Sequence, residues 1–440
     1  MGLVRNTNMS VLLVLLCCFC LEFGLAKDTI TATNFIKDSE TLVSEGSDFK
    51  LGFFSPANST NRYVGIWHGH ISVSTVIWVA NRNKPLKSSS GILTISEDGN
   101  LVVLDGQKEI LWSSNVTNSV DNSSARLLDT GNLVLQENST GRKIWESFQH
   151  PTDTCLPKMK ISTNVRTGEK VQLTSWKSPS DPSIGSFTAG IHPVIPPETF
   201  IWKDGSPYWR SGPWNGRIFT GVSESSNYLF PYGIRVVDDK EGTFYLTFTY
   251  SNQSVLIIFV LDAQGNEKLL SWDEGKEDWE VGWSALKIEC DVYGKCGAFG
   301  SCNSQNSSIC SCFQGFEPKN TEEWNGGNWT SGCVRRTPLQ CERVKSGSEE
   351  GKKDGFLKLN NMKVPDFADW LSANEDECRQ QCLKNCSCLA YAHETGIGCL
   401  SWTRNLIDTH KLSNAGIDLY IRVASSELGE LFLFSVNIRL

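Results

Sequence analysis

Cysteine residues carry the clearest chemical signal in this sequence. Of the 16 cysteines, three lie within the first 26 residues, and of the 13 that follow only Cys155 precedes Cys290. Six fall between Cys290 and Cys333, and six more between Cys341 and Cys399. Thiols at this density form disulfides in an oxidising compartment, whereas a zinc site is the competing interpretation of closely spaced cysteines. Their spacing alone does not choose among the possible pairings.

Other side chains capable of catalysis have no recognisable arrangement. His68 and His70 flank Gly69 without a further ligand set, so we expect an exposed hairpin there. The sequence contains no nucleophile elbow, no glycine-rich phosphate loop and no kinase His-Arg-Asp or Asp-Phe-Gly motif. Two of the 49 acidic residues meeting in a cleft to hydrolyse a glycoside is the remaining enzymatic hypothesis. We expect no enzyme activity, no catalytic residue, no metal and no cofactor.

Length, charge and the N-terminus indicate a secreted protein of several domains. The 440 residues carry a formal net charge of −8, which argues against nucleic acid as a partner. Met1 to Ala26 has the charged start, short apolar run and small-residue end of a signal peptide. Eight Asn-x-Ser/Thr sequons follow and are candidate glycosylation sites: Asn58, Asn115, Asn122, Asn138, Asn252, Asn306, Asn328 and Asn385.

Short strands and turns dominate the first half of the chain, where we expect no helix before His150. Gly99 to Leu104 recurs as Gly131 to Leu135, and Trp112 is echoed by Trp145. With a looser copy around Trp78, the repeat predicts three β units that share a tryptophan centre. Gly-Asn turns before apolar strands are also common in unrelated β proteins, which is the alternative interpretation.

Residues 151 to 285 continue as strands. Thr243 to Tyr250 alternates between threonine or tyrosine and larger apolar side chains, which predicts a half-buried strand, and Val255 to Leu261 suits a buried one. We interpret Ser178 to Pro182 as a connection. Further on, Asn374 and Glu377 have capping-box spacing, so a helix there would place Cys378 and Cys382 on one face.

Several long motifs in order give the chain a family resemblance from Asp28 to Val423. It resembles the extracellular region of plant S-locus glycoproteins and of S-domain (G-type lectin) receptor-like serine/threonine kinases. The resemblance is carried by Tyr63 to Trp67, Val79 to Arg82, Trp145 to Thr154, Tyr208 to Gly216, Cys290 to Phe316, and Lys384 to Cys388.

This resemblance implies a mainly β fold with a bulb-type lectin β-prism, a second β domain and two small disulfide-rich modules. We therefore expect a signal peptide at 1–26, a bulb-type lectin domain at 27–150, and an S-locus glycoprotein domain at 151–285. An EGF-like module would follow at 286–333, a PAN/apple module at 341–424, and an atypical tail at 425–440.

The resemblance also implies a disulfide pairing. In the EGF-like module it joins Cys290 to Cys302, Cys296 to Cys310, and Cys312 to Cys333. In the PAN module it joins Cys378 to Cys399, Cys382 to Cys388, and Cys341 to Cys386. Residues 286–289 lack the acidic or amide cluster of a calcium-binding EGF module, so we expect no calcium there.

Two degenerate windows stand where mannose-binding members of the bulb-lectin fold carry Gln-x-Asp-x-Asn-x-Val-x-Tyr. The first retains Asp98, Asn100 and Val102, and the second retains only Asn132 and Val134. Each window lacks hydrogen-bonding groups that offset the desolvation of a sugar, so we expect weak or no mannose binding.

Cys155 and the C-terminal tail also depart from the family pattern. Cys155 stands where leucine is usual, and we interpret it as a buried free thiol, with an intermolecular bridge as the alternative. After Ala424 the sequence has 16 residues and no membrane span. The chain is therefore expected to be a secreted product or the product of a truncated receptor gene.

Three functions follow from these observations. The first is a secreted or cell-surface recognition glycoprotein that binds a peptide or protein ligand, forms a homodimer or pairs with a related receptor kinase, in pollen recognition or defence. The second is a mannose-binding lectin, and the third is an extracellular enzyme. The degenerate windows disfavour the second function, and the absent catalytic motifs disfavour the third.

Overall fold

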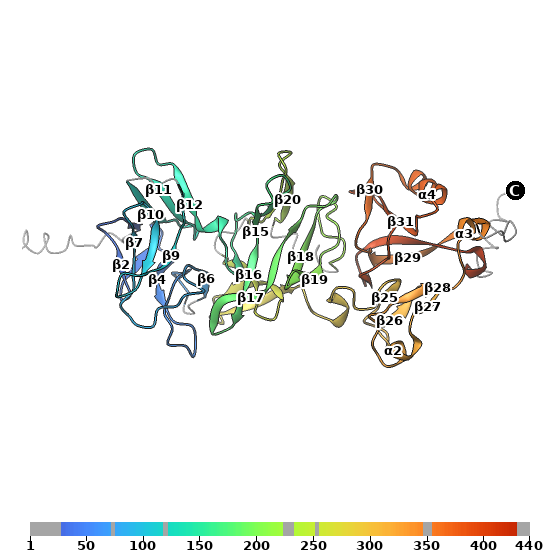
Figure 1. Cartoon of the computed structure of the whole chain (residues 1–440), viewed down its shortest axis with the longest axis horizontal. Helices are drawn as coiled ribbons and strands as arrows, with labels where there is room; N and C mark the ends of the chain where they lie inside the picture. The colour runs from blue at the N-terminus through green and yellow to red at the C-terminus, as the bar shows by residue number, and fades with distance from the viewer. Residues whose placement is uncertain are drawn as a thin grey trace, which may run out of the picture. The chain divides into compact units, whose positions relative to one another are not determined.

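The computed structural model describes residues 28–71, 75–117, 122–222, 233–250, 255–345 and 354–428 (Figure 1). The expected signal peptide, the sequon at Asn252 and most of the expected tail lie outside these residues. The chain divides into two compact units. Unit 1 comprises Met1–Gln149 with Ser180–Ser183, and unit 2 comprises His150–Pro179 with Ile184–Leu440.

Unit 1 contains three antiparallel four-stranded sheets. Their strand orders are β1-β10-β11-β12, β2-β7-β8-β9 and β3-β4-β5-β6. The order of the strands along the chain is nested: β1 pairs with β10 and β2 pairs with β7, while β3 to β6 pair in sequence between them. The strands are β1 (Thr29–Ile30), β2 (Ile36–Lys37), β3 (Thr41–Val43), β4 (Phe49–Phe54), β5 (Tyr63–His68), β6 (Val76–Val79), β7 (Ile92–Ile95), β8 (Leu101–Leu104), β9 (Ile110–Ser113), β10 (Ser123–Leu127), β11 (Leu133–Glu137) and β12 (Lys143–Glu146).

Three indole rings meet at the centre of unit 1. Trp78 on β6 lies 5.7 Å from Trp112 on β9 and 5.9 Å from Trp145 on β12, and the latter two are 5.7 Å apart between ring centroids. All three contacts are edge-on, the arrangement that the aromatic quadrupole favours by roughly 1 kcal/mol per pair. The predicted tryptophan centre shared by three β units is therefore confirmed. The described part of this unit has only one short 3-10 turn, η1 (Ser147–Gln149).

Unit 2 begins with three further four-stranded sheets. Two of them have strand orders like those of unit 1, whereas the third joins the hairpin β14–β15 to the hairpin β20–β21. Their orders are β13-β22-β23-β24, β15-β14-β21-β20 and β16-β17-β18-β19. The strands are β13 (Thr154–Cys155), β14 (Ile161–Asn164), β15 (Lys170–Val171), β16 (Leu173–Ser178), β17 (Asp181–His192), β18 (Glu198–Lys203), β19 (Ser206–Arg210), β20 (Arg235–Asp238), β21 (Thr243–Thr247), β22 (Ile257–Leu261), β23 (Glu267–Asp273) and β24 (Asp278–Ser284).

The connection predicted at Ser178 to Pro182 is wrong for most of its length. Strand β16 ends at Ser178 and β17 begins at Asp181, so only two residues connect them. Proline is tolerated at the start of a strand, where its missing N–H removes no essential ladder bond. Pro182 therefore did not interrupt the element as its residue type suggested.

The C-terminal part of unit 2 is built on an eight-stranded sheet of order β26-β25-β33-β29-β34-β31-β32-β30 and a small hairpin, β27 with β28. Its core includes Trp402, Leu400 and Leu419, each with no exposed surface. The elements are η4 (Glu289–Asp291), β25 (Gly300–Cys302), β26 (Cys310–Cys312), β27 (Phe316–Pro318), α2 (Thr321–Asn325), β28 (Cys333–Arg335), α3 (Gln340–Lys345), β29 (Gly355–Lys363), β30 (Asp369–Leu371), α4 (Glu375–Lys384), β31 (Ala390–Glu394), β32 (Gly398–Trp402), β33 (Thr409–Lys411), β34 (Ile417–Val423) and η5 (Ser425–Glu427).

Strands dominate the described residues, in agreement with the mainly β fold expected from the sequence. The parallel pair β25 and β33 joins the first cysteine cluster to the larger sheet. Among the helices that the structure describes, none combines the length and the hydropathy of a membrane span.

Candidate functional site

The first degenerate sugar window begins in the turn between β7 and β8 of unit 1 and continues into β8. The Asn100 amide oxygen accepts hydrogen bonds from the Ser114 hydroxyl at 2.8 Å and from the Val116 N–H at 2.7 Å. The Asn100 amide nitrogen donates to Asp98 Oδ2 at 3.0 Å. Hydrogen bonds from Ser96 and then Asn100 lower the pKa of Asp98. Asn100 is only 5% exposed, and its polar atoms already have hydrogen-bond partners within the protein.

The second window repeats this arrangement around Asn132, the residue before β11. Asn132 Oδ1 accepts from the Ser147 hydroxyl and from the Phe148 N–H, both at 3.2 Å, and Nδ2 donates to Glu146 Oε2 at 2.7 Å. Asn132 is also 5% exposed. Each asparagine therefore joins the two ends of its own hairpin: Asn100 closes the hairpin of β8 and β9, and Asn132 closes that of β11 and β12.

The aliphatic positions of both windows are likewise enclosed. Val102 is 1% exposed and Val134 is 2% exposed, so neither presents a surface to a sugar ring. A sugar would have to compete with hydrogen bonds that the hairpins already make, at a cost of roughly 1 to 3 kcal/mol for each buried group left unpaired. The structure thus gives the retained residues of the windows a structural role.

His68 and His70 do not both lie on an exposed hairpin, as the sequence had led us to expect. His68 is 5% exposed on β5, and its ring lies 4.7 Å from the Phe49 ring. His70 is exposed and its Nε2 lies 3.4 Å from Asp48 Oδ1. Strand alternation turns His68 inward, and burial lowers its pKa to about 4. The expectation of an exposed hairpin is therefore wrong for His68.

Six disulfides link the twelve cysteines of the two clusters. They have Cα separations between 5.2 and 6.0 Å, within the usual range for a disulfide. The pairs are Cys290–Cys302, Cys296–Cys310, Cys312–Cys333, Cys341–Cys386, Cys378–Cys399 and Cys382–Cys388. These are the same six pairs that the family resemblance implies.

The sulfur atoms of Cys296, Cys302 and Cys310 lie within 4.8 Å of one another, a spacing that would suit a metal ion. All three belong to disulfides, however. A disulfide sulfur is not the thiolate that binds zinc, so this cluster is better explained as the crossing of two bridges.

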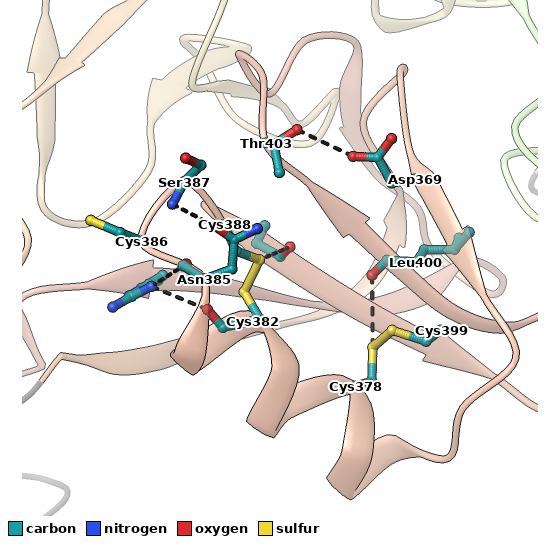
Figure 2. Close-up of a disulfide and its surroundings, with 12 residues drawn as sticks. Asp369, Cys378, Cys382, Asn385, Cys386, Ser387, Cys388, Cys399, Leu400 and Thr403 are labelled. Carbon is teal, nitrogen blue, oxygen red and sulfur yellow. Dashed lines mark hydrogen bonds between the residues drawn. A yellow bond between two sulfur atoms is a disulfide. The ribbon is translucent and has the colours of Figure 1, made fainter. Parts of the chain in front are cut away.

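Two of these bridges hold helix α4: Cys378–Cys399 joins it to β32 of the large sheet, and Cys382–Cys388 joins it to the turn before β31 (Figure 2). Asn374 Oδ1 accepts from the Glu377 N–H at 3.0 Å, and Glu377 Oε2 accepts from the Asn374 N–H at 3.2 Å, which confirms the predicted capping box. Cys378 and Cys382 both face the sheet, 1% and 2% exposed. The bridges close loops of 21 and 6 residues and stabilise the module by roughly 2 to 4 kcal/mol each.

A buried ionic cluster in unit 2 was not predicted from the sequence. Arg210 on β19 has no exposed surface; its Nη1 donates to both oxygens of Glu198 at 3.0 and 3.1 Å, and its Nε donates to Asp408 Oδ2 at 3.0 Å. Lys363 Nζ lies 2.9 Å from the same Asp408 oxygen. Tyr293 donates to Asp366 Oδ2 nearby, at 2.7 Å. The signal for this cluster in the sequence was Arg210 itself, a charged residue inside the aromatic segment Tyr208 to Trp214.

Charges within this cluster shift each other's ionisation. Burial raises the pKa of Asp408, but the neighbouring Lys363 and Arg210 outweigh it and leave that pKa below its usual value. Burial also raises the pKa of Glu198, and Arg210 only partly offsets this. The cluster spans β18, β19, β29 and the residue before β33, so it ties the two halves of unit 2 together.

Cys155 is unpaired and 2% exposed. It lies on β13, which pairs with β22 in the first sheet of unit 2. Burial, and after it the charge of Glu267, raises the pKa of its thiol. This position supports the interpretation of a buried free thiol over that of an intermolecular bridge.

The described sequon asparagines are all exposed, as glycan attachment requires: Asn58, Asn115, Asn122, Asn138, Asn306, Asn328 and Asn385. Trp209 is 5% exposed and its ring packs edge-on against Trp283 at 5.9 Å.

Comparison with known proteins identifies three domains. The chain matches the D-mannose binding lectin model over residues 75–177, the S-locus glycoprotein domain over residues 209–320, and the PAN-like domain over residues 341–409. None of these domains is catalytic.

Curated relatives align along almost the whole chain. A G-type lectin S-receptor-like serine/threonine-protein kinase of Arabidopsis thaliana is 48% identical over 434 residues, which is 97% of this chain and 52% of the relative. A second such kinase of Arabidopsis thaliana, SD1-13, is 45% identical over 423 residues, 95% of this chain and 51% of the relative. The chain therefore spans about half the length of the curated relatives it matches.

Solved structures of lectins match about a quarter of the chain. A monomeric mannose-binding lectin from Gastrodia elata is 24% identical, with a TM-score of 0.22, and covers 28% of this chain and 96% of its own. The mannose-specific agglutinin of snowdrop (Galanthus nivalis) bulbs is 20% identical, with a TM-score of 0.20, and covers 25% of this chain and 88% of its own.

Proposed function

Because the chain has the ectodomain organisation of the G-type lectin S-receptor-like kinases, we propose that it is a recognition glycoprotein that binds a peptide or protein ligand or pairs with a related receptor. Its place is outside the cell or at the cell surface. The sequons carry glycans, and pollen recognition and defence are the two processes it would serve.

An exposed apolar patch in the PAN-like domain carries this proposal. It consists of Phe367, Trp370 and Leu371, which are 52%, 43% and 41% exposed. The last two lie on β30, an edge strand of the eight-stranded sheet. The Trp370 indole N–H donates to the Ile397 carbonyl at 2.7 Å, which fixes the ring in place. A rigid aromatic beside an unpaired strand edge is typical of a protein-binding surface.

The sugar windows support a protein ligand over a carbohydrate. Asn100 and Asn132 use their side-chain oxygens and nitrogens inside the hairpins, and the neighbouring valines are enclosed. Mannose binding is the second candidate function, because the matched lectin model and the solved lectin structures are described as mannose-binding. We give it less weight, since the polar groups that would grip the sugar are engaged.

A binding experiment on immobilised receptor ectodomains tests the proposal. The purified glycoprotein is passed over a panel that contains its own chain and related receptor ectodomains, and compared with the variants Trp370→Ala and Leu371→Ala. Val281→Ala serves as the matched control, because Val281 is 58% exposed on β24, far along the chain from the patch. We expect saturable binding that the two patch variants weaken at least tenfold and the control leaves unchanged. Equal binding by all variants would reject the patch as the contact surface.

The relation of this chain to a complete receptor is a separate part of the proposal. A truncated receptor gene product and a secreted recognition protein would share the ectodomain. The transcript downstream of Ala424 distinguishes them, because a membrane helix and a kinase in frame would make this chain the extracellular part of a receptor.

A further inference from the structure

A polar pocket lies where strand β33 ends, in the C-terminal part of unit 2. Its volume of about 430 Å³ falls within the ~300 to 1,000 Å³ of typical ligand sites. Strand β33 has three residues; it pairs with β25 on one side and with β29 on the other. The last backbone bond of this region runs from the Leu412 N–H to the Asn361 carbonyl at 2.9 Å. The pocket lies beyond that bond, and its lining comes from both neighbours of β33 and from the turn before β34.

His410 forms a buried wall of this pocket. Its side chain is only 8% exposed, and its Nδ1 is 4.0 Å from Asp291 Oδ1, which is too long for a hydrogen bond. No residue that the structure describes makes a hydrogen bond to either ring nitrogen. Burial, and after it the charge of Lys363, lowers the pKa of His410 to about 4, so the neutral ring offers one donor and one acceptor. A buried polar group without a partner is costly, and a ligand that supplies the partner gains binding energy.

The rest of the lining combines one positive charge with many hydrogen-bond donors. Lys411 lines the pocket and forms no ion pair with any described residue; its ammonium group donates to the Asn360 carbonyl at 2.6 Å. The other polar side chains are amides and hydroxyls, from Asn303, Ser304, Gln305, Asn361, Ser413 and Asn414. Within the described part of the chain, only Asn303 among these six uses its side chain in a hydrogen bond, accepting from the Gln305 N–H at 3.0 Å. No carboxylate of the described residues lines the pocket, so its chemistry favours an anion.

We propose that this pocket binds a carboxylate of an acidic peptide, with the Lys411 ammonium group as counter-charge and with the His410 ring and the surrounding amides as hydrogen-bond donors. A single lysine among neutral donors suits the single charge of a carboxylate. Ile288, which is 41% exposed, and the buried Leu412 give the peptide chain an apolar surface. The carboxylate comes from an aspartate or glutamate side chain or from the C-terminus of the peptide. This inference rests on the proposed function, whose peptide ligand it narrows, but the pocket is separate from the apolar patch on β30.

Three short peptides are the probes for this pocket. Acetyl-Ala-Glu-Ala-amide has a side-chain carboxylate, acetyl-Ala-Ala-Ala has a C-terminal one, and acetyl-Ala-Gln-Ala-amide is neutral. Each is titrated by calorimetry into the full-length glycoprotein at low ionic strength, where ion pairs are least screened. The variants are Lys411→Met, which removes the charge, and His410→Phe, which keeps a buried ring but removes both nitrogens. Lys319→Met is the matched control, because Lys319 is exposed and is not part of the lining.

We expect at least one carboxylate peptide to bind at least tenfold more tightly than the glutamine peptide, and the one that does so identifies the source of the carboxylate. Lys411→Met should abolish this preference, and His410→Phe should weaken the preferred peptide at least threefold. Lys319→Met should change its affinity less than twofold. Near-ultraviolet circular dichroism checks that His410→Phe is folded; where it is not, Lys411→Met alone decides. Equal binding of the three peptides by the wild type, or a preference that survives in Lys411→Met, overturns the proposal.

The variant Trp370→Ala separates this proposal from the proposed function. Because Trp370 lies on the β30 patch and not in the pocket, Trp370→Ala should bind the peptides as the wild type does. Loss of the peptide preference in Trp370→Ala would contradict a separate pocket. Retention on receptor ectodomains is a second readout, so a failed peptide titration with intact retention rejects the pocket alone, and lost retention with intact peptide binding rejects the patch alone.

Discussion

Arg210 and Asp408 are 198 positions apart in the sequence, and their side chains form a hydrogen-bonded ion pair of 3.0 Å inside unit 2. Neither side chain is more than 3% exposed. Because Arg210 also binds Glu198, one guanidinium connects the S-locus glycoprotein strands to the PAN-like sheet.

Removing this guanidinium should destabilise unit 2 strongly. Arg210→Ala leaves Glu198 buried without its main counter-charge and Asp408 with only Lys363, a situation that costs about 3 to 5 kcal/mol. Arg210→Lys keeps the charge but loses the two-pronged contact, so we expect an intermediate loss. Urea unfolding followed by tryptophan fluorescence measures the effect.

A surface ion pair in the same unit provides the matched control. Lys240 lies 2.7 Å from Asp238 and is 83% exposed, so Lys240→Ala should change the stability by less than about 0.5 kcal/mol. Similar losses for Arg210→Ala and Lys240→Ala would mean that the buried cluster does not hold the two parts of unit 2 together.

His68 should make unit 1 less stable in acid. Its folded pKa is about 4 and the unfolded value is 6.5, so the unfolded chain takes up a proton first as the pH falls. Stability is full above pH 6.5 and falls by on the order of 3 kcal/mol by pH 4. His68→Phe, measured by thermal unfolding from pH 7.5 to 4, should flatten this dependence, with the value at pH 7.5 as the baseline. An unchanged slope would contradict the burial of a neutral imidazole.

Glu267 should give unit 2 the opposite dependence. Its folded pKa of about 7 lies above the unfolded value of 4.5, so the carboxyl stabilises the fold below pH 4.5 and this contribution is lost as the pH rises through 7. The loss is on the order of 3 kcal/mol. Glu267→Gln should therefore gain stability over the wild type at pH 7.5 and not at pH 4.5. Parallel unfolding curves at both pH values would show that Glu267 is solvated.

Cys155 should stay a reduced, unreactive thiol in the native protein. Its burial and raised pKa predict no reaction with a thiol reagent until the chain is unfolded. Cys155→Ala should be tolerated better than Cys155→Ser, because a buried hydroxyl without a partner costs about 1 to 3 kcal/mol. Non-reducing electrophoresis provides the check. A reducible dimer that disappears in Cys155→Ser would contradict this assignment.

Local signals in the sequence predicted local features well. The capping box of Asn374 and Glu377 and the recurring Gly-Asn turns depend on neighbouring residues, and both appear where they were expected. The tryptophan centre was predictable because matched spacing across a repeat places equivalent side chains at equivalent points.

Features that depend on distant residues were not predictable in this way. The partner Asp408 of Arg210 is 198 residues away in the sequence, and no local pattern identifies it. The first sheet of unit 2 relies on the pairing of β22 with β13, which has two residues and is too short to show a periodicity. The inward orientation of His68 follows from the register of β5, which the pairing with β4 fixes.

Mannose competition tests the central claim, that this chain recognises a protein and not a sugar, most directly. The chain is bound to an immobilised receptor ectodomain that retains it, and methyl-α-mannoside is then added at increasing concentration. We predict that the retained fraction does not change and that mannose-coated resin retains none of the chain, because Asn100 and Asn132 use their side chains within the hairpins. Retention on the mannose resin that free mannoside competes away, and that Asn100→Ala abolishes, would contradict the account.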